Sequence, residues 1–291
     1  MVSDYFSHSA VITGISSGIG RAAVEALLER GWRVFGSVRK ESDADDAIQR
    51  YGDSFTPLIF DVTDESAIND AAEQVSVALE GRTLSGLVNN AGVALGGPLR
   101  YIDLDVVRKQ FDINLFGAIR TTQAFVPLLG ADQERTGPPG KIINMSSVAG
   151  KIATPFLSPY AMSKHALEAF SASLRRELLM HGIDVVVVGP GAVKTPIWNK
   201  GEELDVEPYL ETEYAPLLER MKGLMKEQGE IGIEASKVGE LVADILTGKA
   251  GKTRYAIMRH KLMNWIIPRL IPERLLDIGM ADRFGINKRK T

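Results

Sequence analysis

Short apolar runs alternate with longer amphipathic stretches along most of the 291 residues, and this alternation limits the fold more than any other feature. The apolar runs predict strands at 10–12, 33–38, 56–60, 84–89, 141–145, 184–188 and 254–258. The stretches between them predict helices near 19–30, 65–80, 104–129, 159–181 and 235–247. Alternating strands and helices favour a parallel sheet with right-handed crossovers. We therefore predict an α/β fold with a doubly wound parallel sheet of about seven strands flanked by helices.

The length fits one large α/β domain, and we predict a single domain over 1–291. Two parts of it have unusual charge. Residues 201–234 hold ten Asp or Glu against three Lys or Arg, and residues 252–291 hold ten Lys or Arg against three Asp or Glu. We interpret 196–234 as a mobile segment that covers the substrate, and 259–291 as a C-terminal helical extension.

Composition excludes several classes of site. The chain has no cysteine, so it forms no disulfide, thiolate metal site or cysteine nucleophile. Its four histidines lie too far apart to suggest a local metal cluster, and we predict no metal site. A net charge of −3 gives no global basic field for nucleic acid. No apolar run approaches the ~20 residues that span a bilayer, so we expect a soluble, cytoplasmic protein.

A glycine-rich segment follows directly on the first predicted strand, and a predicted helix begins within it. Glycines let the backbone turn sharply and approach a pyrophosphate closely. The start of a helix offers unpaired N–H groups and a partial positive charge to the same group. The segment therefore predicts a dinucleotide site, with a glycine-rich turn that binds nothing as the alternative. Its residues are Thr13, Gly14, Ile15, Ser16, Ser17, Gly18, Ile19 and Gly20.

The spacing T-G-x-x-x-G-x-G differs from the general dinucleotide fingerprint and resembles that of the classical short-chain dehydrogenase/reductase family. The resemblance extends to Asp61-Val62 and Asn89-Asn90-Ala91-Gly92, which follow the third and fourth predicted strands. In the family, the first pair contacts the adenine, and the second segment stabilises the sheet and borders the adenosine. The resemblance thus implies a Rossmann-type fold, with Asp61, Val62, Asn90, Ala91 and Gly92 at the cofactor.

The end of the second predicted strand bears on which nicotinamide cofactor is bound. An NAD enzyme needs a carboxylate here for the ribose 2′-hydroxyl, but the strand ends in Ser37-Val38-Arg39-Lys40. A guanidinium at Arg39 suits a 2′-phosphate instead. The sequence therefore favours NADP(H) over NAD(H). Against this, Arg39 could be an ordinary solvated arginine, and the glycine segment carries Ser16 and Ser17 where NADP-preferring relatives often have a second basic residue.

Tyr160-Ala161-Met162-Ser163-Lys164 places a tyrosine and a lysine four residues apart, on one face of a predicted helix. A free phenol titrates near pH ~10, which is too high for a good base at neutral pH. A nearby ammonium group favours the phenolate, so a tyrosine beside a lysine can exchange a proton with a carbonyl or an alcohol. Many helices show such a pair by chance, and the pattern alone is weak.

Two more residues match the family's catalytic set. Ser147, thirteen residues before Tyr160, follows the strand predicted at 141–145, and its hydroxyl would bind the substrate oxygen and stabilise developing charge. Ser146 is the less favoured alternative. Asn114 matches the fourth catalytic residue, which in the family orders a water between the lysine and solvent. Each of these residues also has an ordinary structural interpretation, as a turn residue or as a polar residue on a helix.

The segment after the sixth predicted strand completes the resemblance, which covers residues 9 to about 200. In the family this loop holds the nicotinamide carboxamide; alternatively, the segment is an ordinary turn at the end of a strand. Tyr160 and Lys164 would contact the cofactor as well. The residues implied in the loop are Pro190, Gly191, Val193 and Thr195.

The predicted function is the interconversion of an alcohol with a ketone or aldehyde by hydride transfer. The pattern looks most like the retinol and hydroxysteroid dehydrogenase branch, with an acyl-chain 3-hydroxy substrate as an alternative. Apolar residues over 196–228 could line a pocket for such a substrate, or could belong to a helical cover that packs on the core. A cofactor-binding redox sensor is the second hypothesis, although such a protein would be expected to lose Tyr160, Lys164 or Ser147. A sugar-nucleotide epimerase is disfavoured by the glycine spacing.

The resemblance also implies a homodimer or homotetramer, because family members usually pair through the two long helices, here 104–129 and 159–181.

The C-terminal extension interleaves large apolar residues with Lys and Arg, and Pro268 and Pro272 must break it into short helical pieces. It could cover the substrate entrance, pack on a partner subunit, or contact a membrane surface; of these the sequence favours packing.

Overall fold

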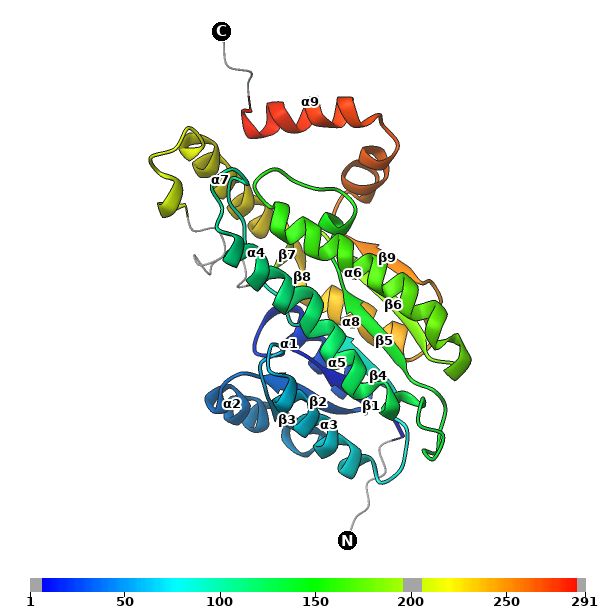
Figure 1. The fold of residues 1–291 in the computed structure, drawn as a ribbon. Helices are drawn as coiled ribbons and strands as arrows, with labels where there is room; N and C mark the ends of the chain where they lie inside the picture. Colours follow the sequence, from blue (N-terminus) through cyan, green and yellow to red (C-terminus); the bar gives the residue numbers. More distant parts are fainter. Residues whose placement is uncertain (1–6, 196–205, 287–291) are drawn as a thin grey trace.

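The computed structural model describes residues 7–195 and 206–286. Its centre is a parallel sheet of seven strands in the order β3-β2-β1-β4-β5-β6-β9 (Figure 1). The chain winds outward from β1 to β3 and then returns to the other side of β1, so β1 and β4 flank the switch point where such sheets bind ligands. This confirms the predicted doubly wound sheet. The strands are β1 (Ser9–Ile12), β2 (Arg33–Val38), β3 (Phe55–Ile59), β4 (Gly86–Asn89), β5 (Lys141–Met145), β6 (Asp184–Pro190) and β9 (Arg254–Ile257).

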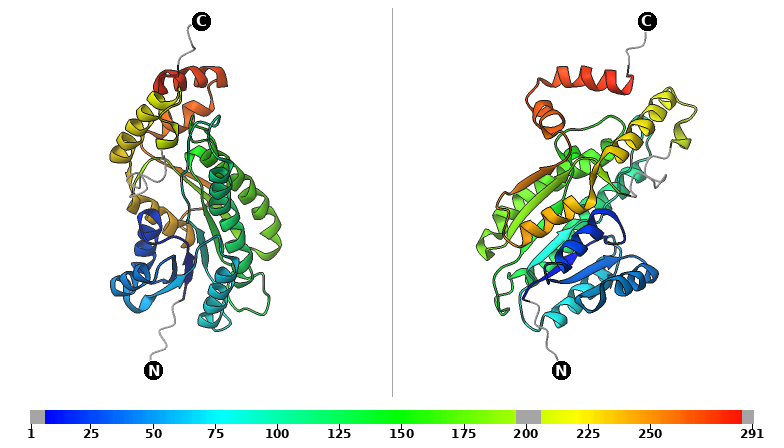
Figure 2. Two further views of the ribbon diagram at one scale, coloured as in Figure 1. Left: turned by 60° about the vertical axis from the view of Figure 1, so that its left-hand side comes forward. Right: turned by 180° about the vertical axis from the view of Figure 1, so that it is seen from behind.

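Helices cover both faces of the sheet, and each face has its own apolar core (Figure 2). One face carries α1 (Gly18–Leu28), α2 (Glu41–Tyr51) and α8 (Ala235–Leu246). The other carries α3 (Glu65–Leu79), α5 (Gly117–Phe125) and α6 (Ser158–Glu177). Because both faces are covered, the central strands are mostly apolar; the four valines at 185–188 of β6 are all buried.

The long helix predicted at 104–129 is interrupted in the structure. It consists of α4 (Leu104–Phe111), a π-helical turn (Asp112–Phe116), α5, and a 3-10 turn (Pro127–Leu129). A π turn inserts an extra residue per turn and often marks a functional position. Asn114 lies within this one, so the prediction of a continuous helix was wrong at the residue expected to have a function.

Helix α2 was not predicted, and a helix in the segment that contains α7 (Ala215–Ile231) was predicted only as one of two alternatives. In α2 only Ala44 and Ala47 are buried, and most of its other side chains are charged or polar, so it has almost no apolar periodicity. Helix α7 lies in the acidic segment and buries only Leu218, Met221 and Gly229.

Helix α7 belongs to a third apolar cluster, which lies beyond the carboxyl ends of the strands and which we call the cover cluster. The short β7 (Val193–Lys194) and β8 (Ile233–Glu234) pair at its base. The C-terminal helix α9 (Glu273–Phe284) also packs against α7 (Figures 1 and 2). The buried members of the cluster are Phe156, Val206, Tyr209, Leu218, Met221 and Phe284. Ile197, Trp198 and Leu204, three of the apolar residues of the predicted pocket segment 196–228, lie outside the described residues.

The C-terminal extension is divided as its prolines predict. A π-helical turn (Leu262–Ile266) and a 3-10 turn (Ile267–Arg269) precede α9. Among the described residues, no helix is both long enough and apolar enough to cross a membrane.

Candidate active site

The glycine segment forms a tight bend between β1 and α1, as predicted. Gly14 and Gly18 have φ angles of +70° and +61°, which only glycine adopts without strain. At Gly20 a Cβ atom would collide with the carbonyl oxygen of Gly14 and lie 2.6 Å from Asn90 Nδ2. The three glycines are therefore required by the bend itself.

The start of α1 is open for an anion. The first N–H groups of a helix have no partner within it, and the side chain of Ser17, at the N-cap, satisfies none of them. Ser16 is exposed and Ser17 half-buried at this end. The bend, the small residues and the free helix end fit the pyrophosphate of a dinucleotide.

Asn90 and Thr13 hold the glycine segment against the end of β4. Asn90 Nδ2 donates hydrogen bonds to the carbonyl oxygens of Thr13 at 2.9 Å and Gly14 at 3.0 Å. The Thr13 hydroxyl accepts from the backbone N–H groups of Asn90 and Ala91, both at 2.9 Å. Residues 90 and 91 thus shape the cofactor site chiefly by fixing its backbone.

The two residues expected at the adenosine end lie together. Arg39 follows β2 and Asp61 follows β3, and a guanidinium nitrogen of Arg39 lies 3.9 Å from a carboxylate oxygen of Asp61. The Arg39 side chain is 69% exposed, so it is free to turn toward a ligand. Val62, in contrast, is buried against α5: a Cβ at Gly117 would lie 2.8 Å from Val62 Cγ2.

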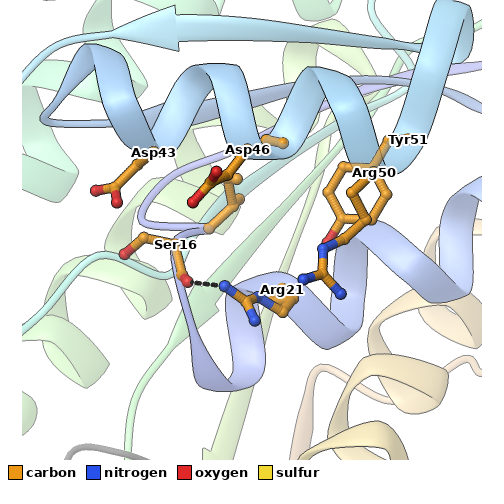
Figure 3. Close-up of a pocket in the computed structure, with 8 residues that line it drawn as sticks. Ser16, Arg21, Asp43, Asp46, Arg50 and Tyr51 are labelled. Carbon is orange, nitrogen blue, oxygen red and sulfur yellow. Dashed lines mark hydrogen bonds between the residues drawn. The ribbon is translucent and has the colours of Figure 1, made fainter.

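A small polar cavity of about 40 Å³ lies behind the glycine segment, between α1 and α2 (Figure 3). Arg21 donates a hydrogen bond to the Ser16 carbonyl there, and Asp43, Asp46 and Arg50 also line it. Arg21 is a cation near the glycine segment that the sequence analysis did not consider; its place in the first turn of α1, four residues after Ser17, was the available signal.

Tyr160 and Lys164 share one face of α6. Lys164 Nζ lies 5.8 Å from the centre of the Tyr160 ring and donates a 2.8 Å hydrogen bond to the Met145 carbonyl at the end of β5. Burial lowers the pKa of Lys164 to about 8, while the negative charge of Glu168 opposes this effect. The lysine therefore remains mainly cationic at neutral pH, next to the tyrosine.

Asn114 joins this group from the π turn. Its side-chain amide accepts from Val93 N and donates to Val93 O, both at 2.9 Å, and it also donates to Ser163 Oγ at 3.2 Å. A Cβ at Gly92 would lie 3.1 Å from Asn114 Oδ1 and 3.7 Å from Lys164 Nζ. Gly92 therefore borders Asn114 and Lys164 together, and a larger residue there would intrude between them.

Ser147 begins a short 3-10 turn after β5, and its hydroxyl accepts a 3.1 Å hydrogen bond from Ala149 N. The neighbouring Ser146 is directed to the other side, where a Cβ at Gly150 would lie 2.6 Å from Ser146 Oγ and 3.1 Å from Glu168 Cγ. The structure thus gives Ser146 a buried position near Glu168.

The loop after β6 reaches back to the glycine segment. A Cβ at Gly18 would lie 3.1 Å from Thr195 Cγ2, so Thr195 contacts the start of α1. Val193 is buried in β7, and Pro190 ends β6. Gly191 packs so closely on Met258 that a Cβ would come within 2.7 Å of the methionine Cβ.

Gln110 and Glu168 are buried polar residues near the site that the sequence analysis missed. Gln110 Oε1 accepts from Leu95 N at 2.7 Å and Gln110 Nε2 donates to Val93 O at 2.9 Å, so it fixes the loop that Asn114 also holds. Glu168 lies one turn after Lys164 and forms a bidentate ion pair with Arg254 of β9 at 2.9 Å. The spacing of 160, 164 and 168 on one helix face was the signal for Glu168.

Comparison with known proteins places the chain among dehydrogenases. The sequence profile described as short chain dehydrogenase matches residues 8–204. NADPH-dependent 3-dehydrocapnine reductase from Ornithobacterium rhinotracheale is 40% identical over 268 residues, with 92% of this chain and 94% of that protein covered. Retinol dehydrogenase 5 from Homo sapiens is 33% identical over 285 residues, with 91% and 85% covered. A crystal structure of a short-chain dehydrogenase from Streptomyces avermitilis superposes with a TM-score of 0.75 at 27% identity, covering 96% of this chain and 98% of that one.

Proposed function

The chain belongs to the short-chain dehydrogenase family, and from that premise we propose which residues carry its reaction and what it acts on. It is an NAD(P)-dependent oxidoreductase that interconverts an alcohol and a ketone or aldehyde. The bound nicotinamide cofactor supplies or accepts the hydride. We assign the remaining chemistry to Asn114, Ser147, Tyr160 and Lys164, within one domain that spans 1–291.

The contact of Lys164 with Tyr160 is the observation that carries this assignment. In reduction, Tyr160 donates its phenolic proton to the carbonyl oxygen, and in oxidation it accepts the proton of the alcohol. The cationic Lys164 stabilises the phenolate that remains. Ser147 donates a hydrogen bond to the same substrate oxygen. Asn114 fixes the loop beside the lysine and orders water there.

We propose a lipophilic substrate. The cover cluster supports this, because aromatic and aliphatic side chains from the 156–157 loop, α7 and α9 meet beyond the carboxyl ends of the strands. Phe156 also has a φ of +65°, a strained value for an aromatic residue, which indicates that the loop holds this ring in place against a cost. The name of one relative, retinol dehydrogenase 5, is consistent with a lipophilic alcohol as substrate.

A series of unbranched aldehydes and ketones of increasing length tests the substrate class. Each methylene that enters an apolar pocket contributes about 0.8 kcal/mol, so kcat/KM should rise roughly fourfold per methylene until the pocket is full. Steady-state NADPH oxidation measures this. Faster turnover of short polar carbonyl compounds than of long apolar ones would contradict the proposal.

We propose NADPH as the cofactor. Two observations support this: the guanidinium of Arg39 is exposed, and one relative is named as NADPH-dependent. Replacing Arg39 by alanine should weaken NADPH binding about ten- to hundredfold, because a charge-assisted hydrogen bond contributes ~1.5–3 kcal/mol. NADH lacks the 2′-phosphate and is the internal control in the same fluorescence titration. Equal changes in Kd for the two cofactors would refute the assignment.

A homodimer or homotetramer is proposed through α4, α5 and α6. Phe116, Met162 and Leu104 are exposed there, and a shallow hollow beside Phe116 is lined by Val107 and Phe111. We expect light scattering at micromolar concentration to give at least twice the chain mass of 31.7 kDa, and Phe116→Arg to reduce it. A wild-type mass of one chain would exclude this assembly.

The location of the protein in the cytoplasm remains a prediction from the sequence.

A further inference from the structure

The C-terminal extension exposes several large apolar side chains, and the proposed function does not use them. In the segment before α9, Leu262, Met263, Ile266 and Leu270 are 60%, 61%, 41% and 77% exposed. We call these four residues the outer patch. Leu262 and Ile266 lie in the π-helical turn, and Leu270 directly follows the 3-10 turn. On α9, Leu275 and Ile278 are similarly exposed.

The inner face of the same segment is anchored to the catalytic helix. Trp265 is buried, and the guanidinium groups of Arg254 and Arg269 lie 4.4 Å and 4.6 Å from its ring centre. Arg254 in turn forms the bidentate ion pair with Glu168 on α6. Burying the outer patch by rotating the segment would break these contacts, so the four apolar side chains are held outward.

The segment that carries the outer patch has charges of one sign. Residues 252–272 contain five Lys or Arg and no Asp or Glu, although the whole chain has a net charge of −3. Arg259, Lys261 and Arg269 form no ion pair within the described parts of the chain. An apolar patch bordered by cations matches an interface that is apolar inside and anionic at its surface.

A second copy of the chain fits this surface poorly. In a two-fold dimer the same patch faces itself, which would bring the cations of one subunit against those of the other. A lipid bilayer with anionic headgroups offers both the apolar interior and the opposite charge. The extension also lies next to the proposed substrate region, because Met280 and Phe284 of α9 pack in the cover cluster.

We propose that the outer patch, with Arg259, Lys261 and Arg269, docks on the surface of an anionic membrane. Docking places the cover cluster beside the bilayer, from which the enzyme draws an apolar substrate; this second part rests on the proposed function. The apolar side chains enter the acyl boundary and the cations bind the headgroups.

Co-sedimentation of the full-length protein with vesicles tests the docking. We expect binding to phosphatidylglycerol–phosphatidylcholine vesicles, weaker binding to pure phosphatidylcholine, and loss at high salt. The triple variant Leu262→Glu, Ile266→Glu, Leu270→Glu should bind at least about tenfold more weakly. The matched control replaces three other exposed apolar residues, Val77, Leu179 and Met180, by glutamate and should bind as the wild type does. An unchanged Kd for NADPH shows that both variants are folded.

The outcomes separate the two proposals. The docking proposal is overturned if the wild type does not bind anionic vesicles, or if the patch variant binds them as strongly as the wild type does. A patch variant with a smaller oligomeric mass than the wild type also overturns it, because a second copy would then cover the patch. If docking holds, the patch variant should need a higher concentration of vesicle-embedded substrate while its kinetics with soluble substrate stay unchanged. Vesicle binding without turnover of any apolar carbonyl compound would refute the proposed function alone.

Discussion

Replacing Tyr160 by phenylalanine is expected to lower kcat by about a hundred- to ten-thousandfold, the usual contribution of a positioned general acid. The variant lacks only the hydroxyl, so the substrate oxygen loses its proton donor while the ring still packs beside Lys164. Binding of NADPH should persist, since we assign most of the cofactor contacts to the glycine segment and α1. Steady-state kinetics and a fluorescence titration measure the two effects separately.

Tyr255→Phe is the matched control for this variant. The Tyr255 hydroxyl accepts a 2.6 Å hydrogen bond from Lys252 N, at the start of β9. The Tyr255→Phe variant should change kcat little, because this hydroxyl has no role in the proposed reaction. A Tyr160→Phe enzyme that kept more than about a tenth of the wild-type kcat, a difference of only ~1.4 kcal/mol, would remove Tyr160 from its assigned role.

Replacing Arg254 by methionine is expected to cost about 3–5 kcal/mol in the free energy of unfolding. The variant leaves the buried carboxylate of Glu168 with Lys151, at 3.4 Å, as its remaining charged partner. It also removes one of the two cations that enclose Trp265. Denaturant unfolding measures the loss. Arg100→Met, which breaks the exposed pair with Glu213, is the control and should cost less than about 1 kcal/mol.

The stability difference between wild type and Arg254→Met should depend on pH. Burial disfavours the charged form of Glu168, but hydrogen bonds and charge from Arg254 outweigh it and lower the pKa of Glu168 below its ordinary 4.5. A carboxyl with a depressed folded pKa stabilises the fold above the unfolded value, and this stabilisation is lost as the pH falls through the folded value. The difference should therefore be full at neutral pH and shrink in acid. A difference that is independent of pH would show that packing alone explains the loss.

Local patterns predicted the sheet and the glycine bend after its first strand. Strands 33–38 and 141–145 were predicted to the residue, because each is an apolar run covered on both faces. Gly14, Gly18 and Gly20 could be assigned because a bend and a close approach leave no alternative residue there. The helical spacing of Tyr160 and Lys164 likewise fixes their relation without any knowledge of the tertiary structure.

Other features depend on contacts that local patterns do not contain. Glu168 and Arg254 are 86 residues apart, and neither position stands out before the fold brings α6 and β9 together. The π turn at Asn114 has no sequence signature of its own, so a continuous helix was expected. Helix α2 has too few apolar residues to show a period. The position of Trp265 between Arg254 and Arg269 could not be predicted, because it depends on the path that the extension takes after β9.

Transfer of deuterium from cofactor to substrate tests the central claim most directly. The wild-type enzyme is incubated with the long-chain aldehyde or ketone that it reduces fastest and with NADPH deuterated at the transferable position of the nicotinamide. We predict that mass spectrometry finds deuterium on the carbinol carbon of the alcohol, and that Tyr160→Phe forms this product far more slowly. Tight binding of NADPH with no deuterated alcohol from any carbonyl compound would contradict the claim and favour a protein that binds the cofactor without turnover.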